Sequence, residues 1–576
     1  MKYNLRENVA EKPAEFGIFS DTLSGLLVNR GITSMREAEA FISPDYKLHT
    51  HDPFLMRDMD KAVERVYKAI KNGEKIIIYS DYDADGIPGA VILYDFFKKL
   101  DVINFENYIP HRHNEGFGLN REAIDEFKTK DAKLLITIDC GAGDADEVDY
   151  ANSLGLDVII TDHHELSDKI PSAFAILNPK LKNCEYPEKM LCGSGVIFKF
   201  AQAFLKKYGA EFNVPVGWEK WLLDLVGIAT LSDMVPLTGE NRVFAFYGLK
   251  VLKKTPRPGL AQLFQKLRVK REHLNEDDIG FTITPRINAA SRMGSPDIAF
   301  NLLSTSDISL AGAYASALEH VNNERKGTVA SLVKEVKKIL SERNIASKKV
   351  IVLGNPAWRP SLLGLVANNL AEQYGKPAFL WGRDGGGVIK GSCRSGRGGN
   401  ENIATSVLSI MQKTPASFSV FGGHGASGGF EVSNDSIHAL AGSLEDAVER
   451  LGIEINNAET AKNYVDARIS LEDISWDLYN DVEKLSPFGV GNPKPLFLIQ
   501  GARIDSVKSF GKDGNHTEII FRDFAERKIS AIQFFLSKES LPVHATPLST
   551  IDFVAHLEKS TFKNYPELRL RIVDIL

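Results

Sequence analysis

Three hydrophobic runs in the first third of the chain each end in an acidic residue. They lead into the motifs Asp81-Tyr-Asp83-Ala-Asp85, Asp139-Cys-Gly and Asp162-His163-His164, and the runs themselves are residues 75–79, 134–138 and 158–161. Short β-branched runs of this kind predict buried parallel strands. In an open α/β sheet, ligands bind beyond the carboxyl ends of such strands. The sequence therefore predicts carboxylates and imidazoles gathered at one edge of one sheet, as in a metal-dependent enzyme.

Composition narrows the classes of protein to which the chain can belong. Its 576 residues exceed what one hydrophobic core serves, so roughly two to four domains are expected. No stretch of about 18 apolar residues is present, so no membrane-spanning helix is expected. The first residues lack the apolar region of a secretion signal, and we expect a cytoplasmic protein. A net charge of −6 argues against general nucleic-acid binding, but it is compatible with a local basic surface.

Five segments are expected along the chain. Residues 1–45 are predicted to be helical, with Ser34 and Glu37 forming a capping box. Asp307 is predicted to cap a long helix that could connect two bodies. The segments are an N-terminal helical part at 1–45, an α/β domain at 46–306, the connecting helix at 307–345, a smaller α/β domain at 346–458 and an all-β module at 459–576.

The second half of the chain carries its own periodic patterns. Apolar residues at helical spacing mark the long helix: Leu310, Tyr314, Ala317, Val321, Val329, Leu332, Val336 and Ile339. Strands are predicted at 349–353, 378–381 and 388–394, followed by glycine-dense turns at 396–399 and 422–429. Short β segments between 496 and 573 predict a small all-β module.

The pattern Asp81-x-Asp83-x-Asp85-Gly also opens a calcium-binding loop. That loop needs a bidentate glutamate at its twelfth position, where this chain has Ile92. A calcium loop also lies between two helices, whereas this segment follows a predicted strand. We therefore favour a different kind of metal site.

The candidate ligands indicate which metal would bind. They are mostly carboxylate oxygens, including Asp233 after the apolar stretch 222–231, with one or two imidazoles and no thiolate. The four cysteines form no CxxC pair, which excludes a zinc ribbon. Such a set favours Mg²⁺ or Mn²⁺ over zinc, and Mn²⁺ suits imidazole better. Two such ions about 3.5–4 Å apart would generate a nucleophile from water and stabilise the leaving oxygen, so phosphoester hydrolysis is predicted.

In this order, the motifs resemble the DHH phosphoesterase superfamily, and most closely its RecJ branch of single-stranded-DNA-specific 5′→3′ exonucleases. Further segments similar to that branch are residues 51–60, 110–119, 285–292, 391–395, 422–424 and 487–493. The resemblance implies an α/β fold in which a long helix joins a parallel-sheet DHH domain to a smaller DHHA1-type domain that binds substrate. It also implies a C-terminal OB-like β-barrel.

The resemblance implies a role for each metal-ligating residue. Asp83 would bind one ion and Asp85 the other, and Asp139 would bridge the two. His163 and Asp233 would complete the second site. These five residues would form the ligand set of a two-ion centre.

The rest of the Asp-His-His motif has other implied roles, and two positions depart from the family pattern. His164 would face the substrate phosphate, and Asp162 would support the histidines. Tyr79 stands where many members have a histidine, which predicts a weaker or more hydrated first metal site. Ser291 replaces a usual glycine before Arg292, which leaves the backbone path of this predicted loop open.

Five residues of the resembling segments are candidates for DNA binding: Arg112, Arg292, Ser392, Arg394 and His424. Arginine suits phosphate because its planar fork donates two parallel hydrogen bonds. Backbone amides of the glycine-dense turns could approach a phosphate closely. The OB-like module adds a surface that could hold single strands by stacking and charge.

We therefore predict a monomeric exonuclease that uses two Mn²⁺ or Mg²⁺ ions and degrades single-stranded DNA from the 5′ end, in DNA repair and recombination. A single-strand-binding protein or a helicase is the expected class of protein partner. Two alternatives remain open. One is a phosphodiesterase of the same superfamily that acts on short oligonucleotides or cyclic dinucleotides, and the other is a non-catalytic replication scaffold. The chain length argues against the first, and the retained acidic and histidine motifs argue against the second.

Overall fold

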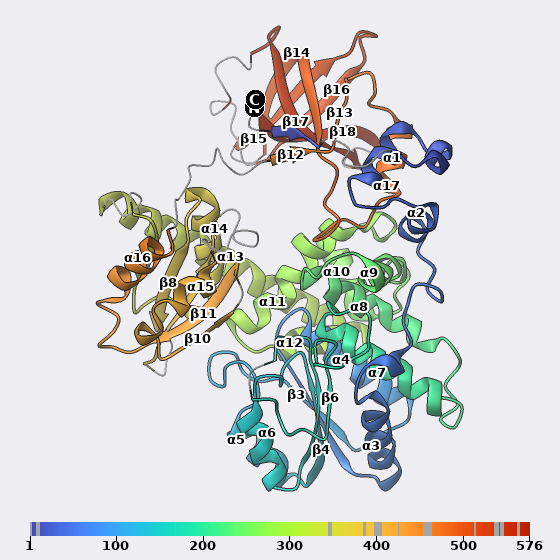
Figure 1. The fold of residues 1–576 in the computed structure, drawn as a ribbon, viewed down its shortest axis with the longest axis vertical. Coiled ribbons are helices and arrows are strands. Elements are labelled where there is room, and N and C mark those ends of the chain that lie inside the picture. Colours follow the sequence, from blue (N-terminus) through green and yellow to red (C-terminus); the bar gives the residue numbers. More distant parts are fainter. Residues whose placement is uncertain are drawn as a thin grey trace. The chain divides into compact units, whose positions relative to one another are not determined.

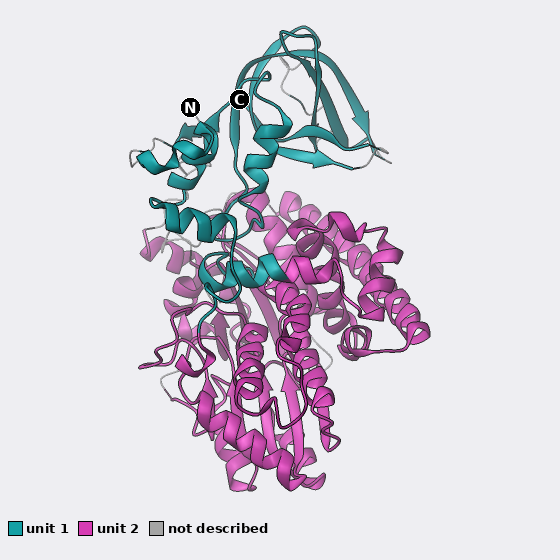
Figure 2. Cartoon of the chain, turned by 90° about the vertical axis from the view of Figure 1, so that its right-hand side faces the viewer, with its two compact units in different colours: residues 1–51, 234–247, 462–576 teal, residues 52–233, 248–461 magenta. Residues whose placement is uncertain are grey.

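The computed structural model describes most of the chain. The described residues are 3–6, 12–166, 169–343, 348–383, 387–396, 406–423, 425–452, 463–511, 514–534, 541, 546–561 and 565–576. They form two compact units, coloured separately in Figure 2. The first unit comprises residues 1–51, 234–247 and 462–576, and the second comprises residues 52–233 and 248–461. The five segment boundaries given above stay a prediction.

A five-stranded parallel sheet is the centre of the second unit, and it contains the three predicted strands. Its order is β3 (Phe105–Tyr108), β2 (Lys75–Ser80), β4 (Ala132–Ile138), β5 (Asp157–Thr161) and β6 (Ala175–Leu177). β2, β4 and β5 are neighbours and run parallel, as predicted. Their side chains are almost entirely buried, because helices cover both faces of a parallel sheet.

Helices cover this sheet on both sides (Figure 1). One side has α5 (Arg121–Thr129) and α6 (Ala145–Ser153), and the other has α3 (Met59–Asn72), α4 (Gly86–Lys99) and α7 (Gly193–Tyr208). The helices α8 (Leu223–Ser232), α9 (Gly239–Leu252), α10 (Pro258–Leu267), α11 (Thr284–Met293) and α12 (Asp297–Ser304) follow in the chain. Among the described residues, no helix combines the length and the apolar character needed to cross a membrane.

The predicted long helix is α13 (Ile308–Glu342), and Asp307 caps it by accepting hydrogen bonds from the amides of Ser309 and Leu310. Its first half packs differently from the predicted apolar stripe. Leu310 is 48% exposed, and the buried positions there are Ala311, Ala315 and Leu318. Small side chains let α13 lie close to α10, α11 and α12. The inward face of α13 is therefore set by these neighbouring helices and not by where its largest apolar side chains lie. Both ends of α13 belong to the second unit.

A second five-stranded sheet follows α13 in the same unit. Its order is β10 (Val420–Gly423), β11 (Ser427–Val432), β9 (Ile389–Arg394), β8 (Ala378–Arg383) and β7 (Ile351–Gly354). The helices α14 (Pro360–Tyr374), α15 (Val407–Gln412) and α16 (Leu440–Arg450) belong to this part. The glycine-rich segment 422–429 was predicted as a turn, but Gly422 and Gly429 pair across the hairpin of β10 and β11. Residues 397–399 of the other glycine-dense segment lie outside the described residues.

The first unit contains a closed five-stranded barrel, as predicted. Its order is β14 (Phe497–Phe510), β15 (His516–Arg522), β16 (Lys528–Gln533), β18 (Glu567–Ile575) and β17 (Thr550–Ser560), and pairing of β17 with β14 closes it. One core joins the barrel to α1 (Asp21–Val28) and α17 (Trp476–Glu483). The Ser34–Glu37 capping box opens α2 (Met35–Ile42).

The N-terminal segment is not wholly helical, contrary to the prediction. β1 (Tyr3–Leu5) pairs in parallel with β12 (Asn463–Val465), and β13 (Ala467–Arg468) pairs with β14. A three-residue strand has no periodicity of its own that could be read from the sequence. It forms because a distant segment offers it a partner.

Candidate metal centre and substrate site

Three neighbouring strands of the parallel sheet are each followed by an aspartate. Asp81, Asp139 and Asp162 are the first residues after β2, β4 and β5. Their amides continue the sheet ladder: Asp81 donates to the carbonyl oxygen of Ile138 at 3.1 Å, and Asp139 donates to that of Thr161 at 2.9 Å. The three carboxylates therefore lie in a row at the carboxyl edge of the sheet.

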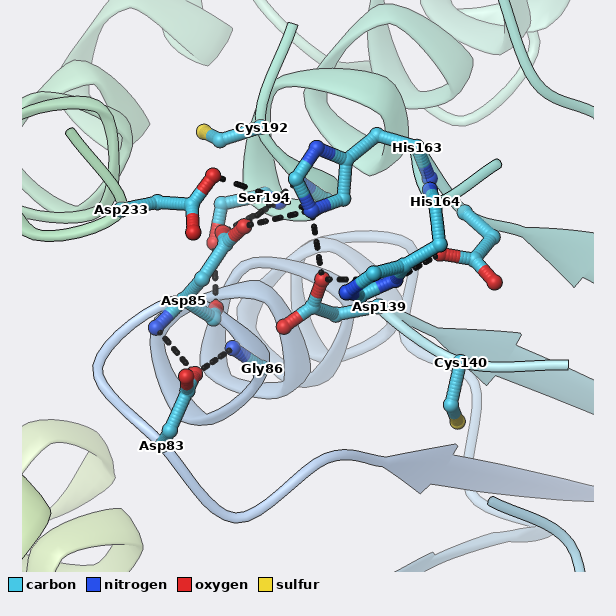
Figure 3. A network of polar contacts seen from close by, with 12 residues as sticks. Asp83, Asp85, Gly86, Asp139, Cys140, His163, His164, Cys192, Ser194 and Asp233 are labelled. Atoms are coloured by element: carbon cyan, nitrogen blue, oxygen red, sulfur yellow. Dashed lines mark hydrogen bonds and ion pairs between the residues drawn. The ribbon is translucent and has the colours of Figure 1, made fainter. Parts of the chain in front are cut away.

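The structure brings Asp139 together with Asp85, Asp233 and the histidine pair (Figure 3). Ligand atoms within 4.8 Å of one another form three groups: Asp81, Asp83 and Asp139; Asp85, His163 and Asp233; and Asp139, His163 and His164. From His163 Nε2, the distances are 3.9 Å to Asp85 Oδ2, 3.1 Å to Asp139 Oδ1 and 3.7 Å to Asp233 Oδ2. Asp139 belongs to two of the three groups and His163 to two, so these two residues link the cluster.

Asp139 is held in an unusual conformation. Its φ of 61° lies in the left-handed region, which non-glycine residues seldom adopt and which tends to occur at functional sites. Its Oδ1 is buried and has no hydrogen-bond partner, although His163 Nε2 lies 3.1 Å away. Because His163 also hydrogen-bonds to the backbone of Leu191, its Nε2 is available to face a cation together with Asp139 Oδ1. The donor set of carboxylates and one or two imidazoles is the kind that Mn²⁺ or Mg²⁺ binds.

Asp85 is fixed by the start of a neighbouring helix. Its two carboxylate oxygens accept hydrogen bonds from the amides of Gly193 at 2.6 Å and Ser194 at 2.7 Å, in the first turn of α7. The helix dipole favours a negative charge at this position. A Cβ atom at Gly193 would lie 2.6 Å from Asp139 Cβ, so only glycine allows α7 to approach the cluster this closely.

Burial and mutual repulsion disfavour the charged form of these acids. They raise the pKa of Asp139 well above its usual value, with Asp85 and Asp83 as the nearest charges. Burial and the charge of Asp83 raise the pKa of Asp85 to about 6, although the α7 amides oppose this. Burial, Asp85 and Asp83 raise the pKa of Asp233 to about 8. Buried carboxylates are seldom kept together without a counter-charge, so the cluster has the electrostatics of a cation site.

The two histidines have opposite electrostatic environments. Burial and the neighbouring His164 lower the pKa of His163 to about 3, which leaves its imidazole neutral, as a metal ligand must be. Burial would lower the pKa of His164 too, but its 2.7 Å hydrogen bond to Asp162 raises it to about 9. Asp162 also accepts hydrogen bonds from the amides of His163 and Ala142. His164 is therefore a cation at neutral pH, oriented by Asp162.

Asp81 is a member of the cluster that was not assigned from the sequence. It is buried, its Oδ1 has no hydrogen-bond partner, and it lies with Asp83 and Asp139. Its signal is its position as the first residue after a strand, which it shares with Asp139 and Asp162. Tyr79, in contrast, offers no ligand: its hydroxyl donates to the carbonyl oxygen of Gly118 at 2.7 Å and accepts from Asn120.

Three of the predicted DNA-binding arginines lie near one another. Burial and the nearby charges of Arg112, Arg394 and Arg325 lower the pKa of Arg292 to about 9. The Arg292 guanidinium donates to the carbonyl oxygen of Ser361 at 2.8 Å, and that of Arg112 lies 4.9 Å from the ring centre of Tyr82. Among the described residues, none of these three predicted arginines has a carboxylate within 4.0 Å. The cluster of Arg112, Arg292 and Arg394 therefore has no ion-paired carboxylate, and the acids whose charges act on it from further away, Asp81 and Asp83, belong to the carboxylate cluster.

The other predicted contacts are placed as follows. Ser392 and Arg394 point to the same face of β9, because strand residues two apart share a face. Gly364 on α14 leaves room for Arg394, since a Cβ there would lie 2.9 Å from Nη2. His424 lies outside the described residues. Ser291 is in helix α11, so the prediction of a loop at this position was wrong.

Comparison with known proteins shows to which protein family the chain is related. Residues 75–230 match the DHH family, N-terminal domain, and residues 465–574 match the RecJ OB domain. The single-stranded-DNA-specific exonuclease RecJ of Bacillus subtilis (strain 168) is 33% identical over 558 residues, which cover 96% of this chain and 67% of that protein. The protein of the same name from Escherichia coli (strain K12) is 30% identical over 502 residues, covering 85% of each chain. The chain belongs to the RecJ family.

Solved RecJ structures agree with this fold. RecJ from Thermus thermophilus in complex with Mn²⁺ matches with a TM-score of 0.79 at 23% identity, covering 96% of this chain and 76% of that one. An exonuclease RecJ bound to manganese matches with a TM-score of 0.57 at 27% identity, covering 69% of this chain and 95% of that one. The predicted fold class, with a parallel DHH sheet, a smaller α/β part and a C-terminal barrel, is confirmed.

Proposed function

We propose that this chain is a metal-dependent exonuclease that hydrolyses phosphodiester bonds of single-stranded DNA from the 5′ end. The observation that carries the proposal is the presence, in one unit, of a carboxylate cluster linked by Asp139 and His163 and of an arginine cluster with no ion-paired carboxylate. The RecJ relatives named above are single-stranded-DNA-specific exonucleases. The 5′ polarity follows from the family resemblance.

The carboxylate cluster would hold two Mn²⁺ or Mg²⁺ ions. Asp83, with Asp81 beside it, would hold the first, and Asp85, His163 and Asp233 the second. Asp139 would contribute to both. Two ions bound in this way supply a nucleophile at neutral pH and neutralise charge on the attacking and leaving oxygens. The amides of Gly193 and Ser194 keep the Asp85 carboxylate in place for this role.

The remaining residues of the site would handle the phosphodiester itself. His164 lies beside Asp139 and is held as a cation by Asp162, so it would donate a charge-assisted hydrogen bond to a phosphate oxygen. Arg112, Arg292 and Arg394, with Ser392, would bind phosphates of the strand near its 5′ end. His424 is assigned to the same task by the family resemblance alone. A phosphate bound among the arginines would relieve the repulsion between them.

The barrel would bind the single strand by stacking and charge, or bind a partner protein. A single-strand-binding protein or a helicase is the partner class that we propose. We also propose that the protein acts as a monomer in the cytoplasm, in DNA repair and recombination.

The test is digestion of single-stranded DNA labelled at the 5′ or the 3′ end, with duplex DNA and a short oligoribonucleotide as alternative substrates. Each is incubated with Mn²⁺, Mg²⁺ or EDTA. We expect immediate release of 5′-labelled mononucleotide from single-stranded DNA with either metal, and none with EDTA. Preferential cleavage of the oligoribonucleotide would instead indicate a short-oligonucleotide phosphodiesterase, and no cleavage of any substrate would indicate a scaffold.

A further inference from the structure

A buried arginine joins the two helices that carry ligands of the second metal group. Arg257 Nε lies 2.9 Å from Asp224 Oδ2 on α8, and its Nη1 lies 2.6 Å from Asp95 Oδ2 on α4. Nη1 also donates to the carbonyl oxygen of Leu303, at the end of α12, at 3.3 Å. The Arg257 side chain is 12% exposed and that of Asp224 is 1% exposed. These contacts form one ion cluster between three helices.

The cluster and the metal ligands occupy opposite ends of the same helix pair. α4 begins after Asp85, and Asp95 is ten residues further along; α8 ends before Asp233, and Asp224 is nine residues earlier. At a rise of about 1.5 Å per residue, each anchor lies about 14 Å from its ligand. α4 and α8 pack against each other and are antiparallel, because one carries its ligand at the N-terminus and the other at the C-terminus.

Apolar packing alone would fix this arrangement poorly. α8 is buried over almost its whole length, and Asp224 is the only charged residue in it. Hydrophobic contacts are not directional, so they keep two helices together but resist sliding weakly. Asp85 is tied to the sheet edge and to the first turn of α7, whereas Asp233 is the residue that caps α8. The distance between the two ligands therefore depends on the register of α8 along α4.

We propose that Arg257 is a positioning residue that fixes the register of α8 against α4 and thereby sets the spacing of Asp85 and Asp233 for the second metal ion. Thr255 supports it, since its hydroxyl donates to Asp224 Oδ2 at 2.7 Å. The guanidinium fork suits this task because its two arms reach two carboxylates in one fixed plane. Supporting residues that do not touch the metal commonly change its affinity by about 10–100-fold. The inference rests on the proposed metal site.

The chain provides a closely matched control at the amino edge of the parallel sheet, opposite the metal ligands. Arg65 is 11% exposed and lies 2.6 Å from Asp157 and 2.7 Å from Glu74. It also donates to a backbone carbonyl oxygen, that of Lys133, at 3.3 Å. Asp157 begins β5 and Glu74 precedes β2, so this cluster lies at the amino ends of the strands. It has the same chemistry as the Arg257 cluster, but it joins no ligand-bearing helices, and the strands that it touches are already fixed to one another by the sheet ladder.

The experiment is a Mn²⁺ titration of the full chain, followed by the electron paramagnetic resonance signal of free Mn²⁺. Arg257→Met is compared with Arg65→Met, and the melting temperature of each metal-free protein is recorded. We expect Arg257→Met to weaken one of two Mn²⁺ sites by about tenfold or more, and Arg65→Met to change neither by more than about twofold. Arg257→Lys should fall between wild type and Arg257→Met, because the ammonium keeps the charge without the fork.

Two outcomes separate the inference from the proposal beneath it. If the wild-type chain binds no Mn²⁺ at this site, the proposed metal centre fails. If the wild-type chain binds two ions and the variants at 257 and 65 lose affinity equally, Arg257 is merely structural and the inference is overturned. Should Arg257→Met not fold, Arg257→Lys and Asp95→Asn give the decision, and wild-type affinity in both would also overturn the inference.

Discussion

The carboxylate cluster and the arginine cluster of the second unit each bury like charges close together, negative in the first and positive in the second. In the first, burial and repulsion raise the pKa values of Asp139, Asp85 and Asp233. In the second, burial and repulsion lower the pKa of Arg292. Neither cluster stabilises the fold by itself, because like charges in a buried place are costly. A bound cation would neutralise the first cluster and a bound phosphate the second, and a metal-dependent nuclease binds both.

The two clusters differ in what holds them together. The carboxylates follow adjacent strands, so the hydrogen-bond ladder of one sheet sets their spacing. The arginines come from the segment after β3, from α11 and from β9, which are far apart in the sequence. A rigid edge suits metal ions, which require fixed ligand distances. Phosphates can be gripped by long side chains from several elements.

The largest effect is expected where the two metal groups meet. Asp139→Ala should retain less than about a tenth of wild-type turnover in Mn²⁺, because we propose Asp139 as the ligand that both ions share. The metal-free melting temperature should stay equal or rise, since repulsion among the remaining acids falls. Turnover on labelled single strands is the measurement. Asp146→Ala, at an exposed carboxylate on α6, is the control and should behave as wild type. Substantial residual turnover of Asp139→Ala would show that the carboxylate cluster does not need Asp139 for catalysis.

The fold and the acidic half of the site were largely predictable, for a physical reason. Strand ends are visible in the sequence as hydrophobic runs, and parallel pairing puts their last residues together. Asp81 could have been assigned by the same rule. The inward face of α13 could not, because Ala311 and Leu318 are buried by the helices that they meet and not by their own size. Nor could the arginine cluster, which depends on tertiary packing and was found only through the family resemblance.

A smaller effect is expected at the arginine cluster. Arg394→Ala should weaken binding of single-stranded DNA by about tenfold, as loss of a hydrogen bond to a charged group does. The log–log salt slope should flatten by about one if Arg394 contacts a phosphate. A 5′-phosphorylated strand should lose more affinity than a 5′-hydroxyl strand. Equilibrium binding in Ca²⁺, over a salt series, measures both.

Gly364→Ala is a finer probe of the same contact, because it keeps the charge. The added methyl group would lie 2.9 Å from Arg394 Nη2 and displace the guanidinium. We expect a loss of the 5′-phosphate preference with an unchanged salt slope. For Arg394→Ala, equal affinity losses for phosphorylated and hydroxyl strands would show that Arg394 does not bind the 5′ end. An unchanged salt slope of Arg394→Ala would show that Arg394 does not contact the strand at all.

Stability of the metal-free protein should depend on pH in a defined window. The folded pKa of Asp233 is about 8 and that of His164 about 9, both above the values of an unfolded chain, so the folded state holds more protons. The stability from Asp233 is therefore lost as pH rises from about 4 to 8, and that from His164 as pH rises from about 6.5 to 9. Between about pH 3 and 6.5, the lowered pKa of His163 acts in the opposite direction. Thermal unfolding in EDTA should show the decline, and Mn²⁺ should abolish it. A flat profile in EDTA would mean that burial and mutual repulsion do not raise the pKa values of these carboxylates.

The smallest effect is expected at position 79. A histidine there was predicted to tighten the first metal site, but the Tyr79 hydroxyl is engaged by Gly118 and Asn120. Tyr79→His should therefore leave the Mn²⁺ dependence of turnover unchanged and lower the melting temperature slightly. A shift of activation to lower Mn²⁺ concentration would show that position 79 can reach the metal.

The central claim is that two metal ions share Asp139, and diffraction from crystals soaked in Mn²⁺ tests it most directly. Data collected at the manganese absorption edge should give two anomalous peaks about 3.5–4 Å apart, the usual spacing in two-metal sites. One peak should lie by Asp81 and Asp83, the other by Asp85, His163 and Asp233, with Asp139 between them. A single peak, or two peaks that do not share Asp139, would contradict the account.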